Sequence, residues 1–248
     1  MIRLSNISKS FQEGSNSVKV LENLTLEIPD KQFLVLVGAN GSGKSTLLNI
    51  LAGTFIPDMG EVILDDRNIT SLPENQRARN IARIFQDPKS GTASELSLLE
   101  NFRLAFLRSH PKGLHIGTGK EFRKMVAEKV LHLKLGLENK LDQLMGTFSG
   151  GQRQALTLLM AAMEKPALLL LDEPAAALDP KTSLNIMEAA NRVIRESELT
   201  AILVTHELKD AIRYGDRVIQ LSEGKIIRDI SGPEKEKLSA VELLSWFE

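Results

Sequence analysis

Apolar residues follow two different patterns in the segments of this chain that resemble strands. Leu24–Ile28 and Glu61–Asp65 alternate apolar and polar positions, which is typical of half-buried antiparallel strands. Phe33–Val37, Leu168–Leu171 and Ala201–Val204 are apolar throughout, as expected for parallel strands buried on both faces. Because a helical pattern follows each of these continuous runs, the sequence predicts an α/β core built on a parallel sheet.

Helical spacing dominates the middle of the chain, from about Pro88 to Met163. Apolar residues recur there at helical intervals, and a loop at Ser109–Gly119 interrupts them; one such set is Phe122, Met125, Val126, Val130, Leu133 and Leu137. We therefore expect one domain, with an α/β core and its β subdomain in residues 1–87 and 164–230, a helical subdomain inserted at 88–163, and a helical tail at 231–248.

The last part of the chain carries two local signals. A turn sequence at Ser222–Gly224 separates two strand-like segments and predicts a β-hairpin over 217–230. Ser239, with Glu242 three residues later, predicts a capping box that opens a helix at 240–247.

The composition is that of an ordinary globular protein. Of the 248 residues, 42% are apolar and 25% are charged, and the absence of cysteine excludes disulfides and thiolate metal sites. A formal net charge of −1 gives no electrostatic footprint for nucleic acid. The longest apolar runs, such as Ala167–Leu171, fall far short of the roughly 20 residues of a membrane span. We expect a cytoplasmic protein with at most peripheral membrane contact, and a solvated face formed by the Lys and Arg residues of Arg67–Arg83.

A glycine-rich loop, Gly38–Ser45, lies between the apolar run 33–37 and the helical run 45–52. Its sequence GANGSGKS fits the pattern G-x-x-x-x-G-K-[ST], and this setting between a strand and a helix is the one that the pattern requires. Without Cβ atoms, the glycines let backbone N–H groups converge where the following helix directs its positive end. Lys44 adds positive charge toward the terminal phosphates, and the Ser45 hydroxyl suits Mg²⁺.

This loop predicts a nucleoside triphosphate site rather than a turn with chance glycines. The residues expected to bind nucleotide are Gly38, Asn40, Gly41, Ser42, Gly43, Lys44, Ser45 and Thr46. Asp172 and Glu173 follow the strand 168–171, at the edge of a parallel sheet where ligands gather. Two such acids alone are more often a solvated turn or a helix cap. With the glycine loop upstream, we assign Asp172 to the Mg²⁺ water shell and Glu173 to the general base.

A second anion site is expected at Phe148–Gln152, because this FSGGQ segment precedes the helical run 153–163. Together with the glycine loop, Asp172 and Glu173, it makes essentially the whole chain resemble the ATP-binding cassette family. The resemblance implies a P-loop NTPase core with an N-terminal antiparallel β subdomain and an inserted α-helical subdomain, and it implies ATP hydrolysis.

The same resemblance implies a homodimer that closes head to tail around two ATP molecules. Ser149, Gly150 and Gly151 would reach the γ-phosphate held by the other copy, and Gln152 would stiffen the segment. Phe148 stands where the family usually has leucine, which should alter only packing.

Four further positions take roles from the resemblance. Gln86 would sense Mg²⁺ and the attacking water, and His206 would be the switch histidine that hydrogen-bonds the γ-phosphate. Asp179 would couple the two sites across the dimer, although Asp179 and Pro180 also read as a helix N-cap followed by the first helical residue. Phe11 would stack on adenine.

The family resemblance favours an ATPase subunit that powers a transporter through ATP-driven dimer closure. Its partners would be a transmembrane permease, docked around Gln86–Asn101 with Gly91–Glu95 lining the groove, and an extracytoplasmic solute-binding protein. Bacterial uptake of a small, amino-acid-like solute at the inner face of the membrane is expected. The alternative is a soluble ABC ATPase of macromolecular assembly, such as iron–sulphur cluster assembly.

Overall fold

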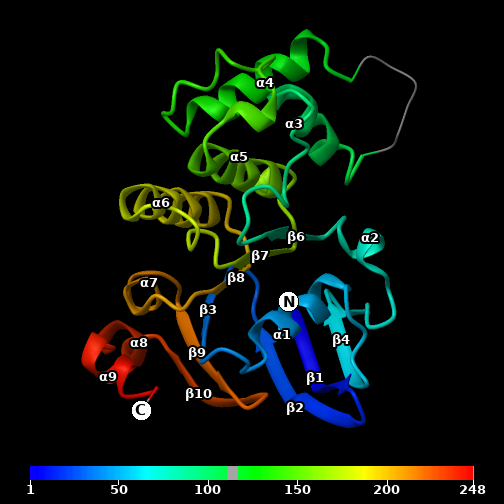
Figure 1. Cartoon of the computed structure of the whole chain (residues 1–248), viewed down its shortest axis with the longest axis vertical. Helices are drawn as coiled ribbons and strands as arrows, with labels where there is room; N and C mark the ends of the chain where they lie inside the picture. Colours follow the sequence, from blue (N-terminus) through cyan, green and yellow to red (C-terminus); the bar gives the residue numbers. More distant parts are fainter. Residues whose placement is uncertain (111–116, 248) are drawn as a thin grey trace. The chain divides into compact units, whose positions relative to one another are not determined.

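The computed structural model describes residues 1–110 and 117–247. Residues 111–116 of the predicted loop Ser109–Gly119 therefore lie outside the described part. The chain divides into two compact units, drawn in Figure 1. The first comprises Met1–Ile81, Ala167–Glu173 and Glu198–Glu248, and the second comprises Ala82–Pro166 and Pro174–Ser197.

The first unit contains an antiparallel sheet with strand order β2-β1-β4-β5 (Figure 1). Its strands are β1 (Ile2–Glu13), β2 (Asn16–Ile28), β4 (Met59–Leu64) and β5 (Arg67–Asn68). The predicted antiparallel strands are confirmed within β2 and β4, but β1 and β2 form a much longer hairpin than the sequence indicates. Register shifts between Leu4 and Ser10 break the alternation along β1, which hides that strand from a pattern search.

The second sheet of this unit has the order β10-β9-β3-β8-β7 and continues to β6 at Ile81, where the chain enters the other unit. Its strands are β3 (Phe33–Val37), β6 (Ile81–Ile84), β7 (Leu168–Asp172), β8 (Ala201–Val204), β9 (Arg217–Ser222) and β10 (Lys225–Ser231). β3 pairs in parallel with β8 and β9, and β7 pairs in parallel with β8. Every residue of β3 and β8 is buried, so the prediction of central parallel strands is confirmed.

Short helices complete the first unit. They are α1 (Lys44–Ala52), α2 (Glu74–Arg77), α7 (Leu208–Arg213), α8 (Pro233–Lys237) and α9 (Ala240–Leu244). At the start of α9, Ser239 Oγ accepts from Glu242 N at 3.2 Å, which is half of the predicted capping box. The predicted hairpin over 217–230 is confirmed as β9 and β10.

The second unit is mainly helical. It contains α3 (Leu98–Phe106), α4 (Lys120–Leu131), a 3₁₀ turn at Met145–Thr147, α5 (Gly150–Ala162) and α6 (Pro180–Glu196). Its core includes buried Leu98, Phe102, Val130 and Leu156. The unit takes in α6, which the predicted range 88–163 leaves outside the helical subdomain, because α6 packs on α5. The helical spacing noted from Phe122 to Leu137 is only partly helix, because α4 ends at Leu131 and buried Leu137 joins the core from a segment that is neither helix nor strand.

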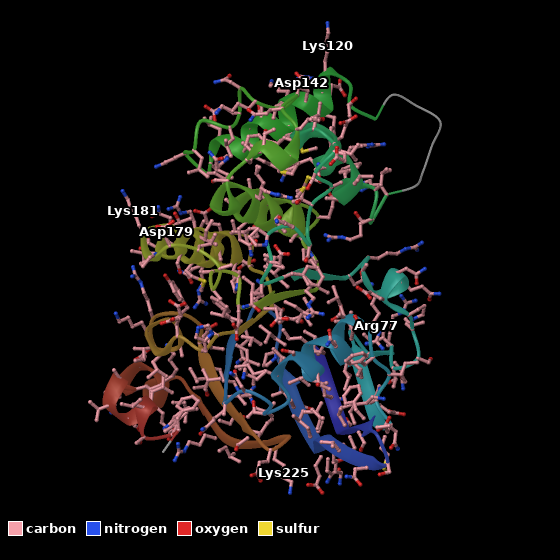
Figure 2. The ribbon with its side chains drawn as sticks, viewed as in Figure 1. Arg77, Lys120, Asp142, Asp179, Lys181 and Lys225 are labelled. Carbon is pink, nitrogen blue, oxygen red and sulfur yellow. The ribbon has the colours of Figure 1, made fainter. Side chains whose placement is uncertain are left out.

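Arg77 contradicts the predicted solvated face. It is 2% exposed, and its guanidinium donates to the carbonyls of Leu72 (2.8 Å), Ile50 (2.6 Å), Leu51 (3.1 Å) and Thr70 (2.8 Å). Ile50 and Leu51 lie in the last turn of α1, whose carbonyls carry partial negative charge. The cation therefore satisfies carbonyls at the C-terminal end of α1, the helix that follows the glycine loop. Figure 2 labels Arg77.

Across residues 1–110 and 117–247, no helix is both long and apolar enough to cross a membrane.

Candidate functional site

The glycine loop joins β3 to α1 and leaves no room for side chains at two of its positions. A Cβ at Gly38 would overlap Leu221 O and lie 2.6 Å from Ser42 Oγ. Gly43, the N-cap residue of α1, has φ of 104°, and a Cβ there would lie 2.9 Å from Val20 O. Because both positions exclude side chains, the loop can pack closely on the neighbouring strands while its N–H groups stay available at the start of α1.

Lys44 points back into its own loop. Its side chain is 7% exposed, and Nζ donates to the carbonyls of Gly38 at 2.8 Å and Ala39 at 2.9 Å. Burial lowers the pKa of Lys44, while the charges of Glu173 and Asp172 act in the opposite direction. The ammonium thus donates to its own loop and is influenced by the charges of Asp172, the last residue of β7, and of Glu173, the next residue.

The side chains of Glu173 and His206 contact each other just beyond the C-terminal ends of the adjacent strands β7 and β8. Glu173 follows β7 with φ of 48°, and its N–H donates to Val204 O at 3.0 Å. Its carboxylate Oε2 lies 3.0 Å from Nδ1 of His206, which follows β8. The Glu173 side chain is 20% exposed and that of His206 is 51% exposed.

The first unit therefore gathers Lys44, Asp172, Glu173 and His206 at the carboxyl edge of its parallel sheet. Parallel pairing of β3, β8 and β7 produces this, since all three strands end at the same edge. Asp172 ends β7 and Glu173 follows it, His206 lies two residues beyond β8, and the glycine loop with Lys44 follows β3. The sequence predicts these residues singly. The hydrogen bond between Glu173 and His206, 33 residues apart, follows from the strand pairing.

Phe11 lies in β1, opposite Val18 of β2, and is partly exposed. Its ring meets that of Phe55 edge-on, with centroids 5.2 Å apart and planes at 67°. Lys9 Nζ lies 5.5 Å from the centroid of the Phe11 ring. Phe55 is not among the residues predicted for the site, although its position just after α1, close in sequence to the glycine loop, is a signal that points to it.

The remaining predicted site residues belong to the second unit. Gln86 follows β6 and is exposed. Ser149 is the N-cap of α5: its Oγ accepts from Gln152 N at 3.3 Å, while Gln152 Oε1 accepts from Ser149 N at 3.0 Å. This reciprocal capping box makes the SGGQ segment a rigid helix start.

The start of α5 also packs tightly against the start of α6. A Cβ at Gly151 would overlap Thr182 Cγ2, so only glycine fits there. Asp179 accepts from Thr182 N at 3.1 Å with Pro180 as the first helical residue, so the N-cap reading of Asp179 is confirmed (Figure 2). Asp179 and the SGGQ segment are therefore neighbours within the second unit.

The donor set predicted for Mg²⁺ consists of a hydroxyl, a carboxylate and an amide, from Ser45, Asp172 and Gln86. Such hard oxygen atoms suit Mg²⁺, which usually keeps several of its waters and takes one or two carboxylates together with substrate phosphates. Among the residues that the structure describes, no group of three or more His, Cys, Asp or Glu side chains could hold a metal by itself. Ser45 and Asp172, both in the first unit, supply a hydroxyl and a carboxylate of the kind that suits an ion arriving with the nucleotide.

Comparison with known proteins shows which family the chain belongs to. The family model for the ABC transporter matches residues 21–176. The tyrosine transport ATP-binding protein of Clostridioides difficile is 40% identical, over 100% of this chain and 99% of that protein. The aliphatic sulfonates import ATP-binding protein SsuB 1 of Rhizobium johnstonii is 38% identical, over 94% of this chain and 77% of its own length.

A solved structure gives the same answer for the fold. The dimeric post-hydrolysis state of the ATP-binding cassette MJ0796 bound to ADP and Pi matches with a TM-score of 0.80 and 30% identity, over 93% of this chain and 98% of that one. The predicted α/β cassette fold is thereby confirmed. The glycine loop before α1, the two acids at the end of β7 and these similarities lead to one conclusion: the chain belongs to the ABC transporter family and is an ATP-binding, ATP-hydrolysing subunit of such a transporter.

Proposed function

We propose that this chain hydrolyses ATP to drive solute uptake through a separate membrane permease. The observation that carries the catalytic part is the cluster of Lys44, Asp172, Glu173 and His206 at one sheet edge, with Glu173 Oε2 3.0 Å from His206 Nδ1.

In this mechanism the glycine loop and Lys44 bind the phosphates. Lys44 leaves the carbonyls of Gly38 and Ala39 and turns to the β- and γ-phosphates, whose charge is a stronger partner than a neutral carbonyl. Ser45, Asp172 and Gln86 would hold Mg²⁺, which neutralises phosphate charge when bound. Asn40, Gly41, Ser42, Gly43 and Thr46 complete the nucleotide contacts.

Glu173 is the general base in this proposal. Its carboxylate accepts a proton from the attacking water, and His206 orients both that water and the γ-phosphate. The side chain of Glu173 is mostly buried and is already held by His206, so little reorientation is needed before the proton moves. Gln86 senses the attacking water and the metal. Phe11 stacks on adenine, and the ring of Phe55 contacts that of Phe11 edge-on.

The second phosphate grip acts between two copies of the chain. Ser149, Gly150 and Gly151 of one copy cap the γ-phosphate held by the other, while Gln152 keeps the helix start rigid and Asp179 couples the two sites. The exposed start of α5 supports this role, because the first N–H groups of a helix attract anions. The dimeric form of the MJ0796 cassette supports the assembly.

The transport part rests on relatives named for tyrosine transport and aliphatic sulfonate import. We propose import of a small, amino-acid-like solute delivered by an extracytoplasmic binding protein. The chain would then work in the cytoplasm, peripherally on the inner face of the membrane, with its permease docked around Gln86–Asn101.

Substitution of Glu173 by Gln tests the catalytic assignment. Turnover should fall by about 10²- to 10⁴-fold, because the amide cannot take the proton, while ATP affinity stays within about twofold. The variant should also elute as a dimer in gel filtration with ATP. Glu198→Gln, at an exposed ion pair with Lys31, is the matched control and should keep wild-type turnover. Wild-type turnover in Glu173→Gln would show that Glu173 is not the general base.

Affinity capture from detergent-solubilised membranes of the source cells tests the transport assignment. Recovery of a polytopic permease together with the chain supports transport. Recovery of soluble assembly factors alone would contradict it and favour the ABC ATPases of iron–sulphur assembly.

A further inference from the structure

Two polar side chains next to the SGGQ segment are buried inside the second unit. Arg153 is 6% exposed and Gln154 is 1% exposed, both in the first turns of α5. Burying a guanidinium and an amide is costly unless they find hydrogen-bond partners. The hydrogen-bond partners of Arg153 and Gln154 therefore show which segments these side chains connect.

Both side chains bind the loop that follows β6. Arg153 Nη2 donates to Thr92 Oγ1 and to Ser94 Oγ, each at 2.9 Å. Gln154 Nε2 donates to Phe85 O at 3.0 Å, at the residue immediately before Gln86. Two consecutive residues of α5 thus hold this loop at both of its ends.

The loop is also fixed from α3. Asn101, 4% exposed, accepts from Ala93 N at 2.8 Å and donates to Ala93 O at 3.0 Å. Gly91 approaches α5 so closely that a Cβ would lie 2.6 Å from Thr157 Cγ2. Residues 85–94 are therefore held by side chains of two helices, although they form neither helix nor strand beyond β6.

The same loop borders a cavity. Gly91 and Ala93 line a space of about 210 Å³ together with Arg83, Leu104 and Arg108. A partner that fills this space contacts the loop. A displacement of the loop would then act on the side chains that hydrogen-bond to it. Packed, hydrogen-bonded interiors transmit such displacements because they have little room to deform.

We propose that Arg153 and Gln154 are positioning residues that make the loop 85–94 and the SGGQ start of α5 move as one body. The inference rests on the proposed function, in which Gln86 acts on the nucleotide of its own copy and the SGGQ segment acts on the nucleotide held by the other copy. Arg153 carries most of this coupling, since its charged guanidinium donates to two hydroxyls, and bonds to charged groups are the stronger kind. Gln154 fixes the backbone next to Gln86.

Hydrogen–deuterium exchange of the full chain without nucleotide tests the coupling. Thr92→Val with Ser94→Ala removes the loop side of the Arg153 contacts and leaves α5 unchanged in sequence. Exchange of the amides at 152–155 should rise about tenfold, the factor expected from losing bonds to a charged group. Arg153→Met should raise exchange in the loop, and adding it to the double variant should change little more. Arg123→Met, which breaks an exposed ion pair with Asp142, is the matched control and should alter neither segment.

Steady-state kinetics supply the second readout. In the Thr92→Val, Ser94→Ala variant, kcat should fall about tenfold with KM for ATP within about twofold, because the first ATP contacts are made elsewhere. Exchange changes confined to the substituted segment, additive effects in the triple variant, or an unchanged kcat would overturn the proposal. Ser149→Arg separates this from the proposed function: wild-type turnover in that variant would remove the SGGQ segment from the site, whatever the exchange experiment gives.

Discussion

Arg77 offers the sharpest test of how this fold supports its phosphate loop. Replacing it by Met keeps an unbranched side chain of comparable length and removes five N–H donors. Four carbonyls, those of Ile50, Leu51, Thr70 and Leu72, lose a hydrogen bond to a cation. We expect the first unit to become less stable.

The size of this loss in unfolding free energy depends on which hydrogen-bond donor each carbonyl has left once Arg77 is replaced. Ile50 O still accepts from Gly53 N at 3.2 Å, so it loses little. Leu51 is fully buried, and an unpaired buried carbonyl costs about 1–3 kcal/mol. Thr70 and Leu72 are partly exposed, so water can replace Arg77 at about 0.5–1 kcal/mol each. Releasing the buried guanidinium offsets part of this loss, which leaves a net destabilisation of about 2–4 kcal/mol.

Urea unfolding followed by the fluorescence of Trp246 measures this loss, because Trp246 is the only tryptophan in the chain and belongs to the first unit. In thermal unfolding followed by the same fluorescence, the melting temperature should fall by about 5–12 °C. Arg79→Met, at an exposed position two residues away, is the control and should stay within about 0.5 kcal/mol of wild type. If Arg77→Met matched that control, the four hydrogen bonds would contribute nothing net and the reasoning would be refuted.

Two other predictions concern charge. Lys44→Ala should weaken ATP binding by about 10- to 100-fold in a titration with a fluorescent ATP analogue, since a charged contact to phosphate is lost. Lys31→Ala is the control. An unchanged ATP affinity in Lys44→Ala would contradict the assignment of the glycine loop. Lys9 Nζ and the Ser10 N–H, both 2.7 Å from the Asp58 carboxylate, hold its pKa below the ordinary value. Because the folded pKa is the lower one, this stabilisation is present above about pH 4 and is lost as pH falls through the folded value. Asp58→Asn should therefore lower the urea midpoint at pH 7 and converge with wild type at low pH; a constant difference at all pH values would exclude this cause.

Much of the core could be predicted from the sequence, because its signals are local. Phe33–Val37 and Ala201–Val204 are the observed β3 and β8, since a strand buried on both faces must be apolar at every position. The glycine loop and the N-cap at Asp179 are equally legible, because glycine and Asx side chains satisfy backbone requirements within a few residues.

The rest depends on contacts between residues distant in sequence. Nothing near Arg77 distinguishes it from the exposed Arg79, and only the carbonyls at the end of α1, about 27 residues earlier, account for its burial. The partners of Arg153 lie 59 and 61 residues away, so the sequence cannot reveal that α5 holds the loop after β6. The bulged strand β1 also escapes detection, because register shifts disturb the two-residue period.

The sequence alone therefore determined the glycine loop and the buried parallel strands beside it, and it predicted the phosphate chemistry of that loop. The tertiary structure decided the polar contacts around these elements: buried Arg77 at the end of α1, half-exposed His206 beside Glu173, and buried Arg153 against the loop after β6. The physical reason is that apolar periodicity and backbone conformation are properties of neighbouring residues, whereas a buried hydrogen bond exists only once the fold brings donor and acceptor together.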